Sequence, residues 1–94
     1  MRWLYGPSSV QSHERAAELV LEPDQAVCSI LALDLLERIR QVGPAQAERM
    51  LASADVPPTC TVGALTARQR AALSAVLRLR ADQLSNRDRA RAAR

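Results

Sequence analysis

The chain has 94 residues, enough for one domain that buries about 60–65% of its unfolded surface and too few for a second domain. All 13 basic side chains are arginine, which excludes Schiff-base chemistry on lysine, and two cysteines with one histidine are too few for a zinc site or a disulfide framework. Residues 1–67 carry five arginines and eight acids (net −3), whereas residues 68–94 carry eight arginines and two acids (net +6). This asymmetry favours nucleic acid or another acidic surface as a partner. The alternative is that the basic segment is only a solvated, solubilising helix.

The N-terminal segment contains the only tryptophan and the only tyrosine, at Trp3 and Tyr5. These rings either cover the helical core or form a docking patch for a second protein, because aromatic side chains are favoured anchors at interfaces. The sequence has no signal-peptide pattern and no apolar run of about 20 residues, so we expect a cytoplasmic protein that does not span a membrane.

Two helices are expected in the first part of the chain. Ser9 or Ser12 can cap a helix that runs to about Leu21, and Pro23 ends it. A short helix over about residues 24–30 follows. Pro23 can occupy its first position, with Asp24 beside it near the positive end of the helix dipole. This helix can continue with a bend to about Arg40. His13 has no partner set of metal ligands or catalytic groups, so we interpret it as a surface histidine.

A helical hairpin centred on Gly43 is the next predicted element. Pro44 suits the first position of a helix, because the amide that proline lacks would have no partner there, and Gly43 can adopt a tight turn. The free amides and the partial positive charge of the second helix would then point outward, which suits a phosphate. Apolar residues at helical spacing on both sides predict that the two helices pack together: Leu35, Leu36, Ile39, Ala47, Met50, Leu51 and Ala54.

The last helix has the clearest start signal in the sequence. Val56, Pro57 and Pro58 stop the preceding helix. Thr66 and Gln69 have the spacing of a capping box, in which each side chain bonds the other residue's backbone amide. The apolar stripe of the helix ends at Leu84. We therefore divide the chain into one helical domain, residues 1–84, and a basic tail, residues 85–94, that either continues the helix or is disordered.

Taken in order, the hairpin LLERIRQVGPAQAERML, the ADVPPT loop, the GALTARQRAAL helix start and the upstream EPDQAV segment resemble the actinobacterial integration host factor. The similarity covers about residues 13–80. It implies an all-α fold of about five helices with a helix-hairpin-helix or helix-two-turn-helix core and a basic C-terminal helix or tail. It also implies binding to duplex DNA through the phosphate backbone with little sequence preference, and no cofactor.

The chain departs from the family where the family is most basic. Gln41, Pro44 and Gln46 stand where the family hairpin is rich in lysine, and the loop before the last helix lacks the family's arginines. Each lost phosphate contact lowers the salt dependence of binding by about 0.9 in slope. The candidate nucleic-acid-binding residues are those that keep a cation, an amide or a hydroxyl near the matched motifs: Arg40, Gly43, Gln46, Thr59, Thr61, Arg68 and Arg70.

The leading hypothesis is a non-enzymatic, architectural DNA-binding protein of the nucleoid, with the C-terminal arginines replacing part of the lost basic loop. A second hypothesis is a divergent relative, encoded by a phage or mobile element, that binds a host protein through Trp3 and Tyr5. A third is binding to RNA or the ribosome. An enzyme is not expected, because the chain has neither a catalytic lysine nor a histidine cluster nor a serine nucleophile elbow, and no catalytic or metal site is assigned.

Overall fold

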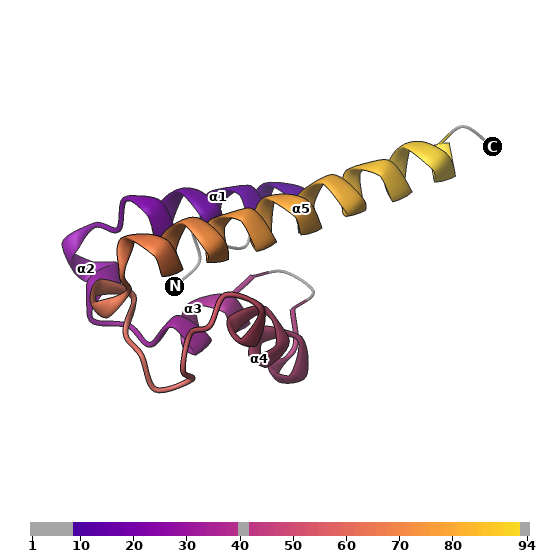
Figure 1. The fold of residues 1–94 in the computed structure, drawn as a ribbon. Coiled ribbons are helices and arrows are strands. Elements are labelled where there is room, and N and C mark those ends of the chain that lie inside the picture. Colours follow the sequence, from indigo (N-terminus) through magenta and orange to yellow (C-terminus); the bar gives the residue numbers. More distant parts are fainter. Residues whose placement is uncertain (1–8, 40–41, 93–94) are drawn as a thin grey trace.

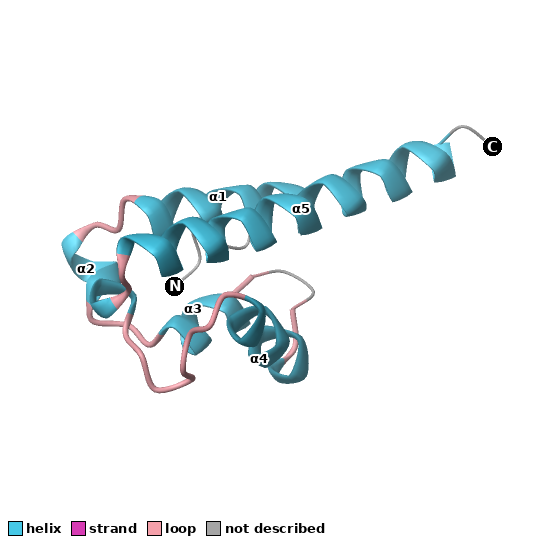
Figure 2. Cartoon of the chain, viewed as in Figure 1, coloured by secondary structure: helices cyan, strands magenta, loops and turns pink. Residues whose placement is uncertain are grey.

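The structure is a computed structural model that describes residues 9–39 and 42–92 (Figure 1). These residues form a small all-α bundle, as predicted, and no strand is present among them (Figure 2). The helices have the following bounds: α1 Ser9–Leu21, α2 Gln25–Cys28, α3 Ala32–Glu37, α4 Pro44–Ser53, a 3-10 turn η1 Val62–Ala64, and α5 Ala67–Ala92.

The two longest helices, α1 and α5, lie side by side and run in opposite directions (Figure 1). α1 buries Ala16, Ala17 and Val20 on one face, which is the helical spacing expected of an amphipathic helix. α5 buries a matching stripe from Leu73 to Leu84. The small alanines allow close approach of the two helix axes, so this pair forms the layer on which α3 and α4 pack.

His13 is buried in α1 with 1% of its surface exposed, so the prediction of a surface histidine was wrong. Val10, Ala16 and Ala17 lie three or four residues from position 13, and Val20 lies seven residues from it. Helical spacing therefore already placed His13 on the buried face of α1, and its polar side chain led to the wrong prediction.

The segment between α1 and α3 differs from the prediction in two respects. Asp24 is the N-cap of α2, with its Oδ1 accepting a hydrogen bond from the amide of Val27 at 3.0 Å, and does not lie inside the helix beside Pro23. The helix also does not bend into α3. The chain is extended at Leu31, where an isolated bridge to Thr61 holds it, because the amide of Val62 donates to the carbonyl of Ile30 at 2.8 Å.

The hairpin between α3 and α4 is longer than the sequence suggested. α3 ends at Glu37, so the described connection begins at Arg38 and reaches Gly43, with Ile39 and Val42 buried along it. Gly43 is the N-cap of α4 with an extended backbone (φ −89°, ψ 173°), and Pro44 occupies the first helical position as predicted. The predicted apolar faces of both helices are buried in the core.

The entry into α5 follows the predicted capping box. The amide of Gln69 donates to Oγ1 of Thr66 at 3.1 Å, and the amide of Thr66 donates to Oε1 of Gln69 at 3.0 Å. The Gln69 amide group also donates to the carbonyl of Asp55 at 2.9 Å, which ties the start of α5 to the turn after α4. Asp55 itself has a positive φ of 57°, a conformation that aspartate tolerates better than most residues.

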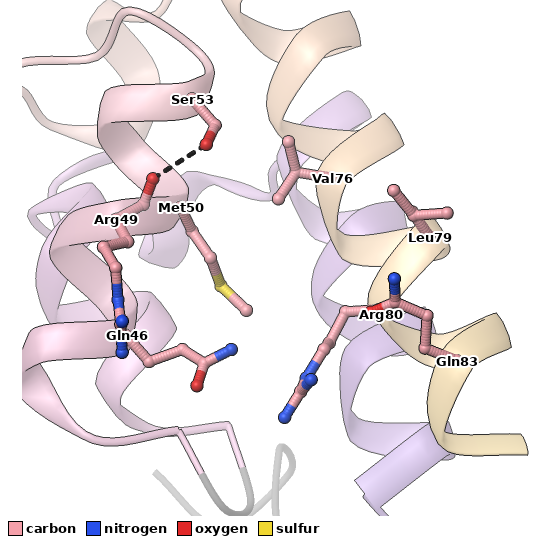
Figure 3. A pocket seen from close by; sticks show the side chains of 8 residues that line it. All are labelled: Gln46, Arg49, Met50, Ser53, Val76, Leu79, Arg80 and Gln83. Carbon is pink, nitrogen blue, oxygen red and sulfur yellow. Dashed lines mark hydrogen bonds between the residues drawn. The ribbon is translucent and has the colours of Figure 1, made fainter. Parts of the chain in front are cut away.

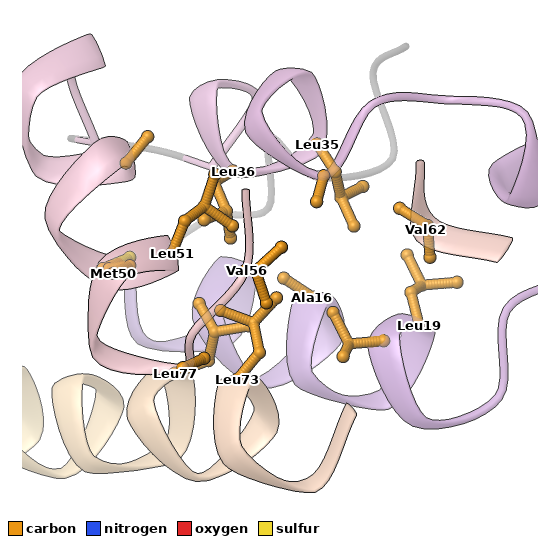
Figure 4. Packing of buried hydrophobic residues seen from close by; sticks show 14 of the residues in the cluster. Ala16, Leu19, Leu35, Leu36, Met50, Leu51, Val56, Val62, Leu73 and Leu77 are labelled. Carbon is orange, nitrogen blue, oxygen red and sulfur yellow. The ribbon is translucent and has the colours of Figure 1, made fainter. Parts of the chain in front are cut away.

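Leucine, valine and alanine fill the core between the α1/α5 layer and the α3/α4 layer (Figure 4). Leu35, Leu36, Leu51, Leu73 and Leu77 are each buried to within 1% exposure. The tail beyond Leu84 continues α5 to Ala92, and beyond Ser85 the side chains described at 86, 87, 89 and 90 are all exposed. We call residues 86–92 the arm of α5, because this part projects beyond the rest of the described bundle (Figure 1).

Candidate nucleic-acid interface

Six of the nine predicted site residues lie in the described part of the chain. Arg40, Trp3 and Tyr5 fall outside the described residues, so their predicted roles stay predictions. The other six fall into two groups by their place in the chain: Thr59, Thr61, Arg68 and Arg70 lie in the loop before η1 and in the first turns of α5, and Gly43 and Gln46 lie at the start of α4.

In the first group, Arg70 supports the fold through its guanidinium. Its Nη1 donates to the carbonyl of Val20 at 3.1 Å, in the last turn of α1, and its Nη2 donates to the carbonyl of Gly63 at 3.1 Å, in η1. Both bonds join segments that are distant in sequence, so Arg70 connects α1, η1 and α5. A guanidinium held in this way has fewer donors left for a phosphate than the sequence pattern suggested.

The remaining members of this group are more accessible. Thr59 and Arg68 are exposed, and Thr61 is half-buried because its backbone bridges to Leu31. Arg68 lies in the first turn of α5, where its positive charge faces the positive end of the helix dipole. This group therefore offers one exposed arginine, one exposed hydroxyl and one half-buried hydroxyl.

The second group, Gly43 and Gln46, lies beside a part of α5 that is about 18 Å along the helix from Arg68. Gln46 lines the same groove as Arg80 and Gln83, and Arg80 is twelve residues from Arg68, at about 1.5 Å of rise per residue. The hairpin contact and the contact at the start of α5 therefore lie apart along α5, and the binding of DNA by either stays a prediction. The order of motifs in the sequence does not reveal this, because α4 runs antiparallel to α5 and its N-terminus lies beside the middle of that helix (Figure 3).

The start of α4 keeps the geometry that suits an anion. Gly43 is exposed and supplies no side-chain cap, and the first described backbone bond of the helix runs from the amide of Ala47 to the carbonyl of Gly43 at 2.9 Å. The amides of Ala45 and Gln46 precede that bond, so they point out of the helix end. α4 has ten residues, which is long enough for a helix dipole to contribute.

Arg87 and Arg89 in the arm of α5 extend this end of the molecule. Both side chains are exposed, and Arg87 lies one turn beyond Gln83, on the side of α5 that faces α4. The sequence placed these arginines in a basic tail but gave them no individual role. The signal that could have identified them is the continuous helix-forming run of arginine and alanine, which allows the helix to persist past its apolar stripe.

The groove between α4 and α5 has a volume of about 350 Å³ and is the other notable feature of this side (Figure 3). Two arginines, two glutamines and a serine line it together with three apolar side chains. No carboxylate is among the lining residues, which are Gln46, Arg49, Met50, Ser53, Val76, Leu79, Arg80 and Gln83.

The described residues give no indication of a metal or membrane site. They contain no cluster of three or more histidine, cysteine, aspartate or glutamate side chains that could hold a metal ion. None of the described helices has both the length and the apolar composition needed to cross a bilayer. Comparison of the chain with protein-family models, curated proteins and solved structures found no match.

Proposed function

We propose that this protein is a non-enzymatic DNA-binding protein that contacts the phosphate backbone of duplex DNA with little sequence preference. The observation that carries the proposal is the arm of α5, which projects beyond the bundle (Figure 1). The side chains of Arg87 and Arg89 in this arm are exposed. Exposed arginines on a helix with no apolar face are suited to a polyanion, because they can reach phosphates without uncovering the core.

The N-terminus of α4 is the second contact in this proposal. Gly43 and Gln46 lie at the end of α4 that faces Gln83, and Arg87 follows Gln83 by one helical turn. Outward amides and a nearby guanidinium can bind neighbouring phosphates on one strand. Because these are backbone contacts, they carry no sequence information, in agreement with an architectural role in the nucleoid.

The sequence resemblance to the actinobacterial integration host factor supports the same function. In this proposal α3 and α4 correspond to the family's helical hairpin, with Gly43 at the start of its second helix. The contacts are redistributed relative to the family. Arginines of the arm take over from the basic loop before the last helix, where this chain has Cys60, Thr61 and Gly63.

Fluorescence anisotropy with two 20-base-pair duplexes of unrelated sequence, at 50 and 150 mM salt, tests the proposal. We expect both duplexes to bind with similar affinity, and the Arg87→Ala/Arg89→Ala variant to reduce the slope of log K against log salt by about 1.8, or about 0.9 per lost contact. The matched control is Arg15→Ala/Arg78→Ala, which removes the same charge from exposed sites on α1 and α5 that have no proposed role.

Three outcomes would count against the proposal. Failure of the unaltered protein to bind either duplex at 50 mM salt would refute DNA binding. Equal losses in the two double variants would show that net charge, and not the arm, governs affinity. A larger loss in the Arg15→Ala/Arg78→Ala protein would place the DNA-binding surface on α1 and the adjoining face of α5. A duplex RNA of the same sequence distinguishes the RNA-binding alternative by binding more tightly than DNA.

A further inference from the structure

We infer that the groove between α4 and α5 binds a short acidic amphipathic helix of a partner protein. This inference goes beyond DNA binding and shares only Gln46 with the contacts proposed for DNA. The sequence also suggested a protein partner, but through Trp3 and Tyr5, whereas the surface inferred here is the groove between α4 and α5. Figure 3 shows the groove with its lining side chains.

The groove is built from two matching stripes. α4 contributes Gln46, Arg49, Met50 and Ser53, which have the spacing i, i+3, i+4 and i+7, and α5 contributes residues at the same spacing from position 76 to position 83. Residues at this spacing lie on one face of a helix. Each stripe is therefore two turns, or about 10 Å, long. A third helix of two to three turns fits along such a channel between two antiparallel helices.

The apolar part of the groove favours a protein occupant. Leu79 is 60% exposed, the most exposed large apolar side chain among the described residues, and Val76 and Met50 continue the apolar surface inward. Two leucines one turn apart on a partner helix would cover these side chains. A DNA backbone has no apolar groups to cover Leu79, so the groove is poorly suited to nucleic acid.

The charged part of the groove favours an acidic occupant. Arg49 is exposed, and the Nε atom of Arg80 is buried in the described structure without a hydrogen-bond partner. Among the described side chains the one ion pair joins Arg15 to Glu18 on α1, so neither groove arginine is neutralised there. Glutamates that flank the partner's leucines could accept hydrogen bonds from both guanidiniums.

The nearest acidic side chains of this chain point elsewhere. Glu48 is two residues from Gln46, which places it about 200° around α4 from the groove, and Asp82 lines the opposite side of α5 with Val10 and Glu14 of α1. The only charged side chains that line the groove are therefore the two arginines, although α4 and α5 both carry acids. This separation of charge defines the partner's chemistry as acidic.

A labelled model peptide tests the inference. The probe is an acetylated 14-residue peptide of leucine, alanine and glutamate, with leucines at i, i+3, i+4 and i+7 and glutamates beside them. Its twin has glutamine in place of every glutamate. We expect the acidic peptide to bind the full chain saturably, the twin to bind at least tenfold more weakly, and amide chemical shifts to change at residues 46–53 and 76–83.

Two substitutions on exposed residues locate the site without disturbing the core. Leu79→Ala and Arg49→Glu should each weaken peptide binding at least tenfold. Leu21→Ala and Arg15→Glu are the matched controls, because Leu21 is the other exposed large apolar side chain, at 42%, and Arg15 is an exposed arginine on α1. The controls should change affinity less than twofold, and circular dichroism should show that all four variants fold.

Each alternative occupant gives a different result that would overturn the inference. Equal binding of the acidic peptide and its glutamine twin, or no saturable binding at millimolar peptide, excludes an acidic helix. Loss of duplex DNA affinity in Leu79→Ala would show that the groove takes nucleic acid. Self-association of the unaltered protein that Leu79→Ala abolishes would make a second copy the occupant. Because the DNA proposal is tested at Arg87 and Arg89, either proposal can fail without the other.

Discussion

Replacing Gly63 by alanine should destabilise the protein, because the backbone of Cys28 leaves no room for a methyl group at this position. A Cβ atom built at Gly63 would lie 2.9 Å from the carbonyl oxygen of Cys28 and 3.0 Å from its Cβ atom. The carbonyl oxygen is backbone at the end of α2, so it cannot move aside as a flexible side chain could. Either η1 or the end of α2 must shift to accept the methyl group.

The expected cost follows from two opposing terms. Inserting a methyl group into a packed contact costs about 1–3 kcal/mol. Replacing glycine by alanine also restricts the unfolded chain, which offsets about 0.4–1 kcal/mol of that cost. The net loss of unfolding free energy is therefore about 0–2.6 kcal/mol, with a central value of about 1.3 kcal/mol. For a domain of this size, each 1 kcal/mol corresponds to a fall in Tm of about 4–8 °C.

Gly43→Ala is the matched control for Gly63→Ala. A Cβ atom at Gly43 meets nothing within 4 Å, and its backbone is extended, so alanine fits without strain. Glycine is a better N-cap than alanine, and this loss roughly cancels the gain from a less flexible unfolded chain, which leaves a change within about 0.5 kcal/mol. Urea unfolding followed by circular dichroism at 222 nm measures both variants. A Gly63→Ala midpoint equal to or above that of Gly43→Ala would refute the steric argument.

The other predictions concern residues whose roles the structure separates. Arg70→Ala should lower the unfolding free energy by about 1–2 kcal/mol, because it removes the hydrogen bonds to the Val20 and Gly63 carbonyls; a loss of DNA binding with unchanged stability would contradict this. Leu77→Ala should lower the free energy of unfolding in urea by about 2–5 kcal/mol, because Leu77 is buried, whereas Leu79→Ala should change it by less than about 0.5 kcal/mol, because Leu79 is exposed. Similar losses in the two variants would mean that the core is misassigned. Thr66→Ala should cost about 1 kcal/mol by removing the cap that accepts from Gln69, and thermal unfolding unchanged from the unaltered protein would rule out that role for the cap.

The role of Arg70 affects how DNA-binding variants are chosen. From sequence alone, Arg68 and Arg70 were both candidate phosphate contacts at the start of the last helix, with Arg68 favoured. In the structure Arg68 is exposed, whereas Arg70 connects three segments. A variant that removes both would lose stability and charge together, and its weaker binding could not be assigned to either. The pair Arg87 and Arg89 avoids this difficulty, because both lie outside the bundle.

The groove between α4 and α5 was not predictable from the sequence. Gln46 was chosen as a phosphate contact, and Arg80 was noted as an interruption of the apolar stripe of the last helix. Neither observation indicated that the two residues line one groove, since 33 intervening residues separate them in the chain. Their proximity follows from the antiparallel packing of α4 on α5, which brings the first turn of one helix to the middle of the other.

The sequence by itself determined the features that depend on neighbouring residues. Helical periodicity gave the buried faces of α3 and α4, Pro44 gave the start of α4, and the Thr66 and Gln69 pair gave the start of α5. These features are local because backbone amides at a helix start find partners within four residues. The tertiary structure alone decided the bonds of Arg70 and the separation of Gly43 from Arg68, because each depends on which segments pack together across long stretches of chain.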